Sequence, residues 1–249
     1  MPTLKGFRKV PPALLAPRAK LEASLLPLRN STILPSMKWI GLLTICALLG
    51  ACAMGNRYDY ASVRATVAPP VKSSAVAVAT IDRREYLLRG EIEDSYVGMT
   101  RGGFGNPFRV FTRSKAPLSE DLSAAVAGSL RDAGVKAQAV TSFSVTSRDS
   151  AISRLKASGA SKLVLITIRE WESDTLIRTE LTASVTVEVL SPSGQVLASD
   201  SFEGRRSLGG DILNPVLHAR KTVLAETSKI LGSLISSPKI AAALRGSTG

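Results

Sequence analysis

The chain has 249 residues, 45% of them hydrophobic, which is enough for one domain with a substantial core. Its net charge is +12, but residues 1–51 hold seven of the 32 basic and one of the 20 acidic residues, so residues 52–249 carry a net charge of +6. The charges of this part are scattered along the sequence, which argues against a nucleic-acid-binding surface. The two cysteines, Cys46 and Cys52, leave none after residue 52, which excludes a disulfide or a cysteine-based metal site within residues 53–249.

The first predicted element is a short apolar segment at residues 39–49, which contains no charged residue and follows Lys38. Its 11 residues are too few to cross the roughly 30 Å hydrocarbon core of a bilayer as a helix. This length, with a basic residue on the N-terminal side, is typical of the apolar region of a secretory signal peptide.

The segment ends in Leu49–Gly50–Ala51–Cys52, which resembles a bacterial lipobox. The resemblance implies cleavage between Ala51 and Cys52 and attachment of lipid to Cys52, so that the mature protein is anchored to a membrane. Ala53 replaces the Asp that retains many lipoproteins in the inner membrane, so we expect the outer membrane, on the side that faces the periplasm. The periplasmic side of the inner membrane is the alternative.

The chain before the signal peptide is unusual, because residues 1–36 are rich in Pro, Leu and basic side chains. Met37 stands directly before Lys38 and the apolar segment, where a translation start is expected. We therefore interpret residues 1–36 as an extended or wrongly assigned N-terminal region and residues 37–51 as the signal peptide. A start at Met1 gives the same mature protein.

Residues 52–74 are polar and interrupted by glycine and proline, which predicts a flexible tether. Residues 75–81 are small and β-branched and predict a buried strand. Residues 85–117 lack periodicity and predict a loop insertion. Its glycine-rich part, residues 101–108, lacks the spacing of a phosphate-binding loop and is interpreted as a surface loop that carries Phe104 and Phe108.

The remaining pattern alternates between helical and strand periodicity and ends in a disordered tail. It predicts helices at 118–134, 149–159 and 215–236, strands at 135–145, 162–172, 176–190 and 195–202, and the tail at 241–249. The order β-α-β-α-β-β-β-α predicts an α+β two-layer sandwich over residues 75–240, with a mixed sheet and helices packed on one face.

Four segments of this pattern resemble the YajG-type family of small outer-membrane lipoproteins. They are Val78–Arg83, which ends a strand in Asp-Arg, Ala133–Val135 after a helix, the apolar Leu163–Ile166, and the turn Ser193–Gln195. The resemblance covers residues 75–240 and implies an envelope lipoprotein that assists a transporter or an assembly and has no known catalytic residues.

Candidate interaction residues are Asp82, Arg83, Phe104, Phe108 and Trp171. Asp82 and Arg83 suit either an anion site or a brace for the turn after the first strand. Trp171 suits either a contact anchor or packing at the sheet edge. The single histidine, His218, has no partner in the sequence pattern that would orient it as a base.

These observations predict a non-enzymatic binding or assembly module of the cell envelope, with no cofactor and no metal. Its expected contacts are the membrane, through the lipid on Cys52, and an envelope protein whose identity the sequence does not give. One alternative is a lipid- or ligand-binding accessory subunit of a transport system, which would use a groove between helices and sheet. An enzyme that acts on envelope polymers, dependent on His218 or Asp82, is the third hypothesis.

Overall fold

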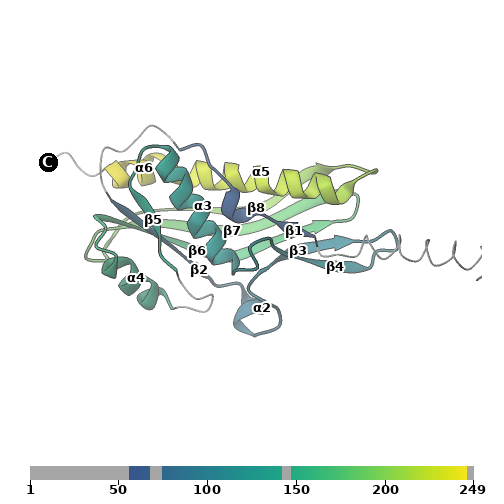
Figure 1. Ribbon diagram of the computed structural model, residues 1–249, viewed down its shortest axis with the longest axis horizontal. Helices are drawn as coiled ribbons and strands as arrows, with labels where there is room; N and C mark the ends of the chain where they lie inside the picture. Colours follow the sequence, from purple (N-terminus) through teal and green to yellow (C-terminus); the bar gives the residue numbers. More distant parts are fainter. Residues whose placement is uncertain (1–55, 68–74, 142–146, 246–249) are drawn as a thin grey trace, which may run out of the picture. The chain divides into compact units, whose positions relative to one another are not determined.

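The computed structural model describes residues 56–67, 75–141 and 147–245 (Figure 1). The predicted N-terminal region, signal peptide and lipobox, with Ala51 and Cys52, lie outside the described residues. Within the described ranges, no helix is long and apolar enough to span a bilayer.

The described part of the chain is an α+β fold. Its strands are β1 (Arg57–Tyr58), β2 (Val76–Asp82), β3 (Tyr96–Arg101), β4 (Pro107–Thr112), β5 (Ala137–Ala139), β6 (Lys162–Thr175), β7 (Arg178–Leu190) and β8 (Val196–Gly210). Its helices are the 3-10 turn η2 (Tyr60–Ser62), then α2 (Glu85–Leu88), α3 (Leu118–Asp132), α4 (Arg148–Ala157), α5 (Pro215–Ile235) and α6 (Pro238–Arg245). The α+β fold class and the mixed sheet agree with the prediction from the sequence.

The long strand β6 organises the sheet. On one edge it pairs antiparallel with β7 along its whole length, and β7 pairs in turn with β8. On its other edge the first half of β6 pairs parallel with β2, which continues to β5, and its last three residues pair parallel with β3, which continues to β4 and β1. One strand therefore connects two smaller groups of strands.

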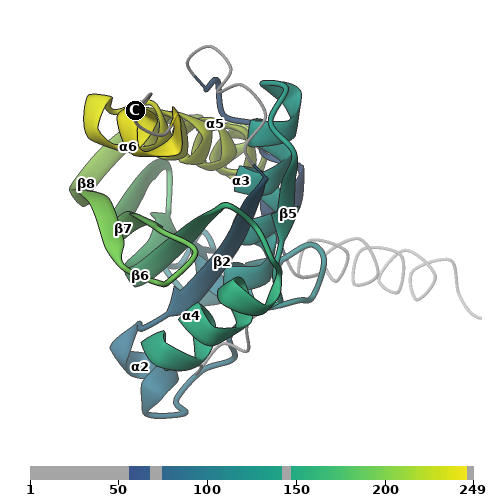
Figure 2. The ribbon, with the colours of Figure 1, turned by 90° about the vertical axis from the view of Figure 1, so that its left-hand side faces the viewer.

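Helices cover both faces of this sheet, which corrects the expectation that they pack on one face (Figure 2). Helices α3, α5 and α6 lie on one side, and α4 lies on the other against β2 and β6. The reason is that all seven residues of β2 are buried, so both of its faces need cover. Ala77, Ala79 and Leu163 pack towards α4, whereas Val78 and Val164 pack towards the main core.

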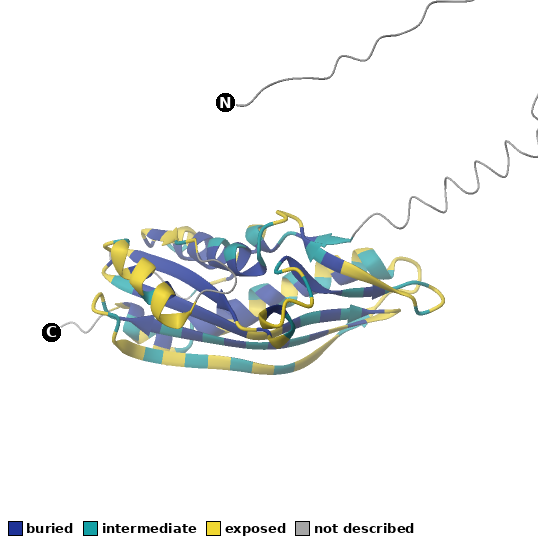
Figure 3. Cartoon of the chain, turned by 90° about the horizontal axis from the view of Figure 1, so that it is seen from below, coloured by how far each residue is buried: buried dark blue, intermediate teal, exposed yellow. Residues whose placement is uncertain are grey.

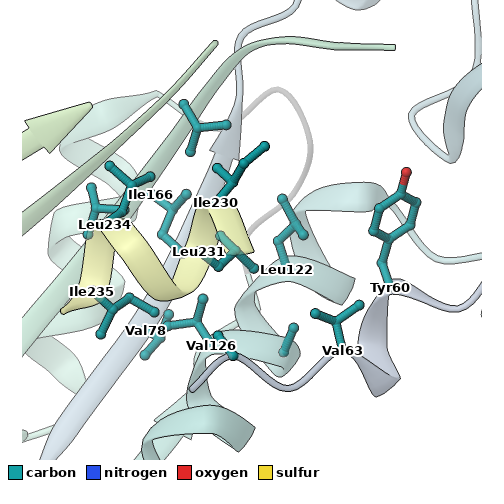
Figure 4. Close-up of a cluster of buried hydrophobic side chains, with 14 of the residues drawn as sticks. Tyr60, Val63, Val78, Leu122, Val126, Ile166, Ile230, Leu231, Leu234 and Ile235 are labelled. Atoms are coloured by element: carbon teal, nitrogen blue, oxygen red, sulfur yellow. The ribbon is translucent and has the colours of Figure 1, made fainter. Parts of the chain in front are cut away.

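The main core fills the layer between the sheet and helices α3 and α5 (Figure 4). Val78 and Ile166 project from the sheet, and the apolar faces of the two helices meet them. The helical contributors include Leu122, Val126, Ile230, Leu231 and Leu234, each at most 4% exposed. One alternative from the sequence was a lipid- or ligand-binding groove between the helices and the sheet. Apolar side chains fill that space.

Residues 56–67 belong to the folded domain, which corrects the prediction that the whole of 52–74 is a tether. Strand β1 pairs parallel with β4, and Tyr58 and Tyr60 are fully buried. The backbone N–H of Ala65 donates to Ser129 Oγ at 2.9 Å. Elements of two and three residues are too short to show a periodicity, so the sequence pattern missed them.

Residues 85–117 are also more ordered than a loop insertion, because they contain α2, β3 and β4. Strands β3 and β4 form an antiparallel hairpin whose turn is the glycine-rich segment, with Phe104 at its tip. The predicted disordered tail needs a similar correction, because α6 extends to Arg245 and buries Ile240 and Leu244.

Candidate functional site

Asp82 and Arg84 form a buried ion pair at the end of β2. Both side chains are fully buried, and Arg84 Nη2 lies 2.7 Å from Asp82 Oδ2. Arg84 Nη1 donates to the carbonyl oxygens of Tyr96 at 2.6 Å and Trp171 at 3.2 Å. The pair thus joins the end of β2 and the start of β3 to the middle part of β6, and it is closed to a ligand. Asp82 braces the fold and is not a surface contact residue.

Trp171 is also fully buried, so its predicted role as a contact anchor is wrong for this fold. Its Nε1–H donates to Tyr60 Oη at 3.0 Å, and the two rings meet edge to face with centroids 6.0 Å apart. The side chain connects β6 to η2 and fills the core. Its role is packing, although at the centre of the fold rather than at a sheet edge.

Arg83 points the other way, because neighbouring residues on a strand face opposite sides of the sheet. Its side chain is exposed, and it lines a hollow of about 640 Å³ on the α4 side of the sheet. Strands β6, β7 and β8 and the start of α4 supply the other walls. The lining residues are Ile81, Arg83, Ser147, Arg148, Thr167, Arg169, Thr186, Glu188 and Ser199, and we call this hollow the arginine groove.

Arg169 lies in the groove at a β-bulge of β6. Ile168 pairs with Val185 and Glu170 pairs with Ser184, so Arg169 is the additional residue between two consecutive partners on β7. Bulges of this kind redirect a side chain and are frequent beside functional sites. Arg169 Nη1 donates to Thr186 Oγ1 at 3.0 Å, which holds the guanidinium over the sheet.

The arginine groove is basic. Its three arginines face one carboxylate, that of Glu188, which pairs with Arg148 at 2.8 Å between Nη2 and Oε1. Among the described residues, no ion pair partners Arg83 or Arg169. Guanidinium groups bind carboxylates and phosphates through paired N–H donors, so two of the three arginines can receive an anionic group. The neighbouring hydroxyls can donate further hydrogen bonds to it.

Phe104 and Phe108 lie apart from this groove, on the β3–β4 hairpin, and are 99% and 49% exposed. The structure therefore brings Asp82 and Trp171 together in the interior and leaves Arg83 and the two phenylalanines on separate surfaces. His218 lies elsewhere again, with its Nε2 3.0 Å from the carbonyl oxygen of Leu208. No group of three or more His, Cys, Asp or Glu side chains within the described ranges is arranged to hold a metal.

Sequence reasoning missed two of the three groove arginines. Arg148 and Arg169 stand 65 and 86 residues after Arg83 and meet it only because β2 and β6 are neighbours and α4 covers them. The available signal was the alternation at the end of the apolar β6 run, which places Thr167 and Arg169 on the face that carries Arg83.

The sequence matches no protein-family profile and no curated protein. Comparison with solved structures finds similar folds. Protein XCC0632 of Xanthomonas campestris, from family DUF330, is 20% identical over 72% of this chain and 96% of its own, with a TM-score of 0.45.

The PelC dodecamer of Paraburkholderia phytofirmans is 16% identical over 72% of this chain and 94% of its own, with a TM-score of 0.39. Lipoprotein GNA1162 of Neisseria meningitidis is 12% identical over 63% of this chain and 99% of its own, with a TM-score of 0.27. The resemblance to the YajG-type family is not tested by these matches and stays a prediction.

Proposed function

We propose that this protein is a lipid-anchored, periplasm-facing binding module of the cell envelope, and that it acts without catalysis. Its arginine groove takes an anionic group of a partner, of which an acidic segment of another envelope protein is the form that we favour. The observation that carries this proposal is the convergence of Arg83, Arg148 and Arg169 around one hollow with a single carboxylate.

The groove suits recognition of an extended segment. Its floor is the outward face of β6, β7 and β8, and β8 is an edge strand without a buried residue (Figure 3). Ser147, Thr167 and Thr186, which carry hydroxyl groups, line the groove together with the arginines. Such a surface offers charge-assisted hydrogen bonds at several points along a partner, which favours specificity and a fast association rate.

In-cell crosslinking tests the groove. A photoreactive amino acid at Ser199, inside the groove, should give a specific crosslinked band in intact cells. The double variant R83E/R169E should abolish that band, because two favourable contacts become repulsive. Lys136→Glu is the matched control, since Lys136 is an exposed cation outside the groove. An unchanged band in R83E/R169E would remove the groove from the proposal.

Anchorage has its own test. Cells that express the full chain with Cys52→Ala should incorporate no labelled palmitate into it, whereas the wild-type chain should be labelled and recovered with the membranes. Separation of inner from outer membranes then decides between the two locations, of which we favour the outer membrane. A wild-type chain without label would overturn lipid attachment and leave the groove experiment unaffected.

A further inference from the structure

Exposed apolar side chains gather at one end of the folded domain. Phe104 at the tip of the β3–β4 hairpin, and Ile212 and Leu213 between β8 and α5, are 99%, 80% and 96% exposed. Four more apolar residues of the same end are between 41% and 49% exposed: Phe108, Leu176, Ile177 and Leu217. We call these seven residues the apolar end. A group of exposed apolar side chains at one end of a domain is typical of a site of contact with protein or membrane.

Sheet register explains why three loops meet there. Thr100 of β3 pairs with Thr175 at the end of β6, so the β3–β4 hairpin extends beside the β6–β7 turn. Arg178 at the start of β7 pairs with Gly210 at the end of β8, which brings the β8–α5 loop to the same place. Figures 1 and 3 show all three loops at the right-hand end of the domain.

A fixed turn holds two of these side chains outward. The carboxylate of Asp211 accepts the backbone N–H groups of Leu213 at 2.8 Å and Asn214 at 3.1 Å. Asn214 in turn caps α5 by accepting the N–H of Leu217 at 3.0 Å. Because the loop is ordered by its own hydrogen bonds, the exposure of Ile212 and Leu213 is a property of the fold.

The predicted lipid is attached close to this end. The first described residue, Asn56, donates to Thr100 Oγ1 at 3.3 Å and accepts from Arg220 at 3.5 Å, so it lies beside the β3–β4 hairpin near its turn and beside the start of α5. Cys52 precedes Asn56 by four residues. Even fully extended, four residues span about 14 Å, so the lipid cannot reach the opposite end of the domain.

Charges around the apolar end favour an anionic surface. Arg109, Arg178, Arg220 and Lys221 are exposed beside it. Acids near this end are already engaged, since Asp174 pairs with Arg101 at 2.6 Å, Glu180 pairs with Arg205 at 3.4 Å, and Asp211 accepts the backbone bonds of the turn. Exposed arginine and lysine next to apolar side chains suit the boundary between anionic headgroups and acyl chains.

We propose that the apolar end is inserted into the interfacial layer of the same lipid bilayer that holds the Cys52 lipid, an inference that rests on the proposed anchorage. The anchor and the loops then act together as a two-part attachment, which fixes the orientation of the domain. Nine residues of extended β7 separate Ile177 from Thr186, so the arginine groove stands about 30 Å above the membrane surface and faces the periplasm.

Depth-dependent fluorescence quenching tests this orientation. The Cys52 sulfur of the mature lipoprotein is occupied by lipid, so one introduced cysteine is the only free thiol and can carry a bimane label. Labels at Phe104→Cys and Ile212→Cys report on the apolar end. The control is Ser193→Cys, exposed in the β7–β8 turn at the far end of a 13-residue strand, about 40 Å away. The vesicles contain phosphatidylethanolamine, phosphatidylglycerol and brominated phosphatidylcholine.

We expect bromine to quench the labels at 104 and 212 severalfold more strongly than the label at 193. Adding Leu213→Ser should reduce the quenching at 212, because the loop loses part of its apolar contact. Equal and weak quenching at all three positions in vesicle-bound lipoprotein would overturn the inference and leave the anchorage standing. A second copy of the protein could instead shield the label at 104 in detergent, with no quenching in vesicles. That result would assign the apolar end to self-association and would also overturn the inference.

Discussion

Asp82, the last residue of β2, and Arg84, two residues further along the chain, form an ion pair with no solvent exposure, while Arg83 between them reaches the opposite face of the sheet. The alternation of a strand thus separates a structural pair from a candidate binding residue. Arg84 also donates to backbone carbonyl oxygens of β6 and β3, so one guanidinium connects three strands.

We expect Arg84→Met to destabilise the domain by about 3–5 kcal/mol, because it leaves the Asp82 carboxylate buried without its partner. Arg83→Met should change the free energy of unfolding by less than about 0.5 kcal/mol, because its side chain is exposed. Urea unfolding of both variants measures the difference. Adding Asp82→Asn to Arg84→Met should recover part of the loss, and its failure to do so would show that the carbonyl contacts of Arg84 dominate.

The hydrogen bond from Trp171 to Tyr60 gives a second prediction. Tyr60→Phe removes the acceptor and leaves a buried indole N–H without a partner, which should lower the free energy of unfolding by about 1–3 kcal/mol. Tyr58→Phe is the matched control, because the buried Tyr58 hydroxyl has no hydrogen-bond partner among the described residues. A loss in Tyr58→Phe as large as in Tyr60→Phe would mean that the hydroxyl of Tyr60 has no special role.

The elements with long regular patterns were predictable from the sequence. The alternation of Leu181 to Val189 and the apolar run from Leu163 to Ile166 identified β7 and β6, and α5 begins and ends within one residue of its expected range of 215–236. These segments are long enough for their burial to dominate the residue pattern.

The short and irregular elements were not predictable. Strand β1 has two residues. Strand β3 is interrupted by Gly98, and β4 begins with Pro107. Their strand conformation depends on pairing with β6 and with each other, which is a tertiary effect. The arginine groove was missed for a related reason, since its members come from four strands and one helix and no local spacing connects them.

Gly98 illustrates such a tertiary requirement and gives a third prediction. Its φ is +146°, at a register shift in the β3–β4 pairing, and a Cβ there would collide with backbone and side-chain atoms of Ser173. Gly98→Ala should therefore destabilise the domain by about 2 kcal/mol or more, since either strand must move. Gly103→Ala, in the open turn of the same hairpin, should cost less than about 0.5 kcal/mol. Thermal unfolding of the two variants measures the difference. Equal losses of stability in both would mean that the hairpin is not tightly packed against β6.

Asp121, in the first turn of α3, gives a pH prediction. Burial raises the pKa of its carboxyl to about 6, from an ordinary value of 3.8, and Oδ2 has no hydrogen-bond partner among the described residues. Between these two pKa values the unfolded chain has lost the proton that the folded chain still holds. The folded state therefore binds more protons, and its stability falls as the pH rises from about 4 to 6.

Asp121→Asn removes this titration, so its stability relative to the wild type should depend on pH. The difference should be constant below about pH 4, increase in favour of the variant between pH 4 and 6, and then stay level, with a total change of up to about 3 kcal/mol. Urea unfolding at a series of pH values measures it. Glu120→Gln, which changes the half-buried acid beside it in the same helical turn, is the control. A difference that stays constant from pH 4 to 7 would show that Asp121 titrates at its ordinary pKa, because the carboxylate is then stabilised by the helix N-terminus as effectively as by water.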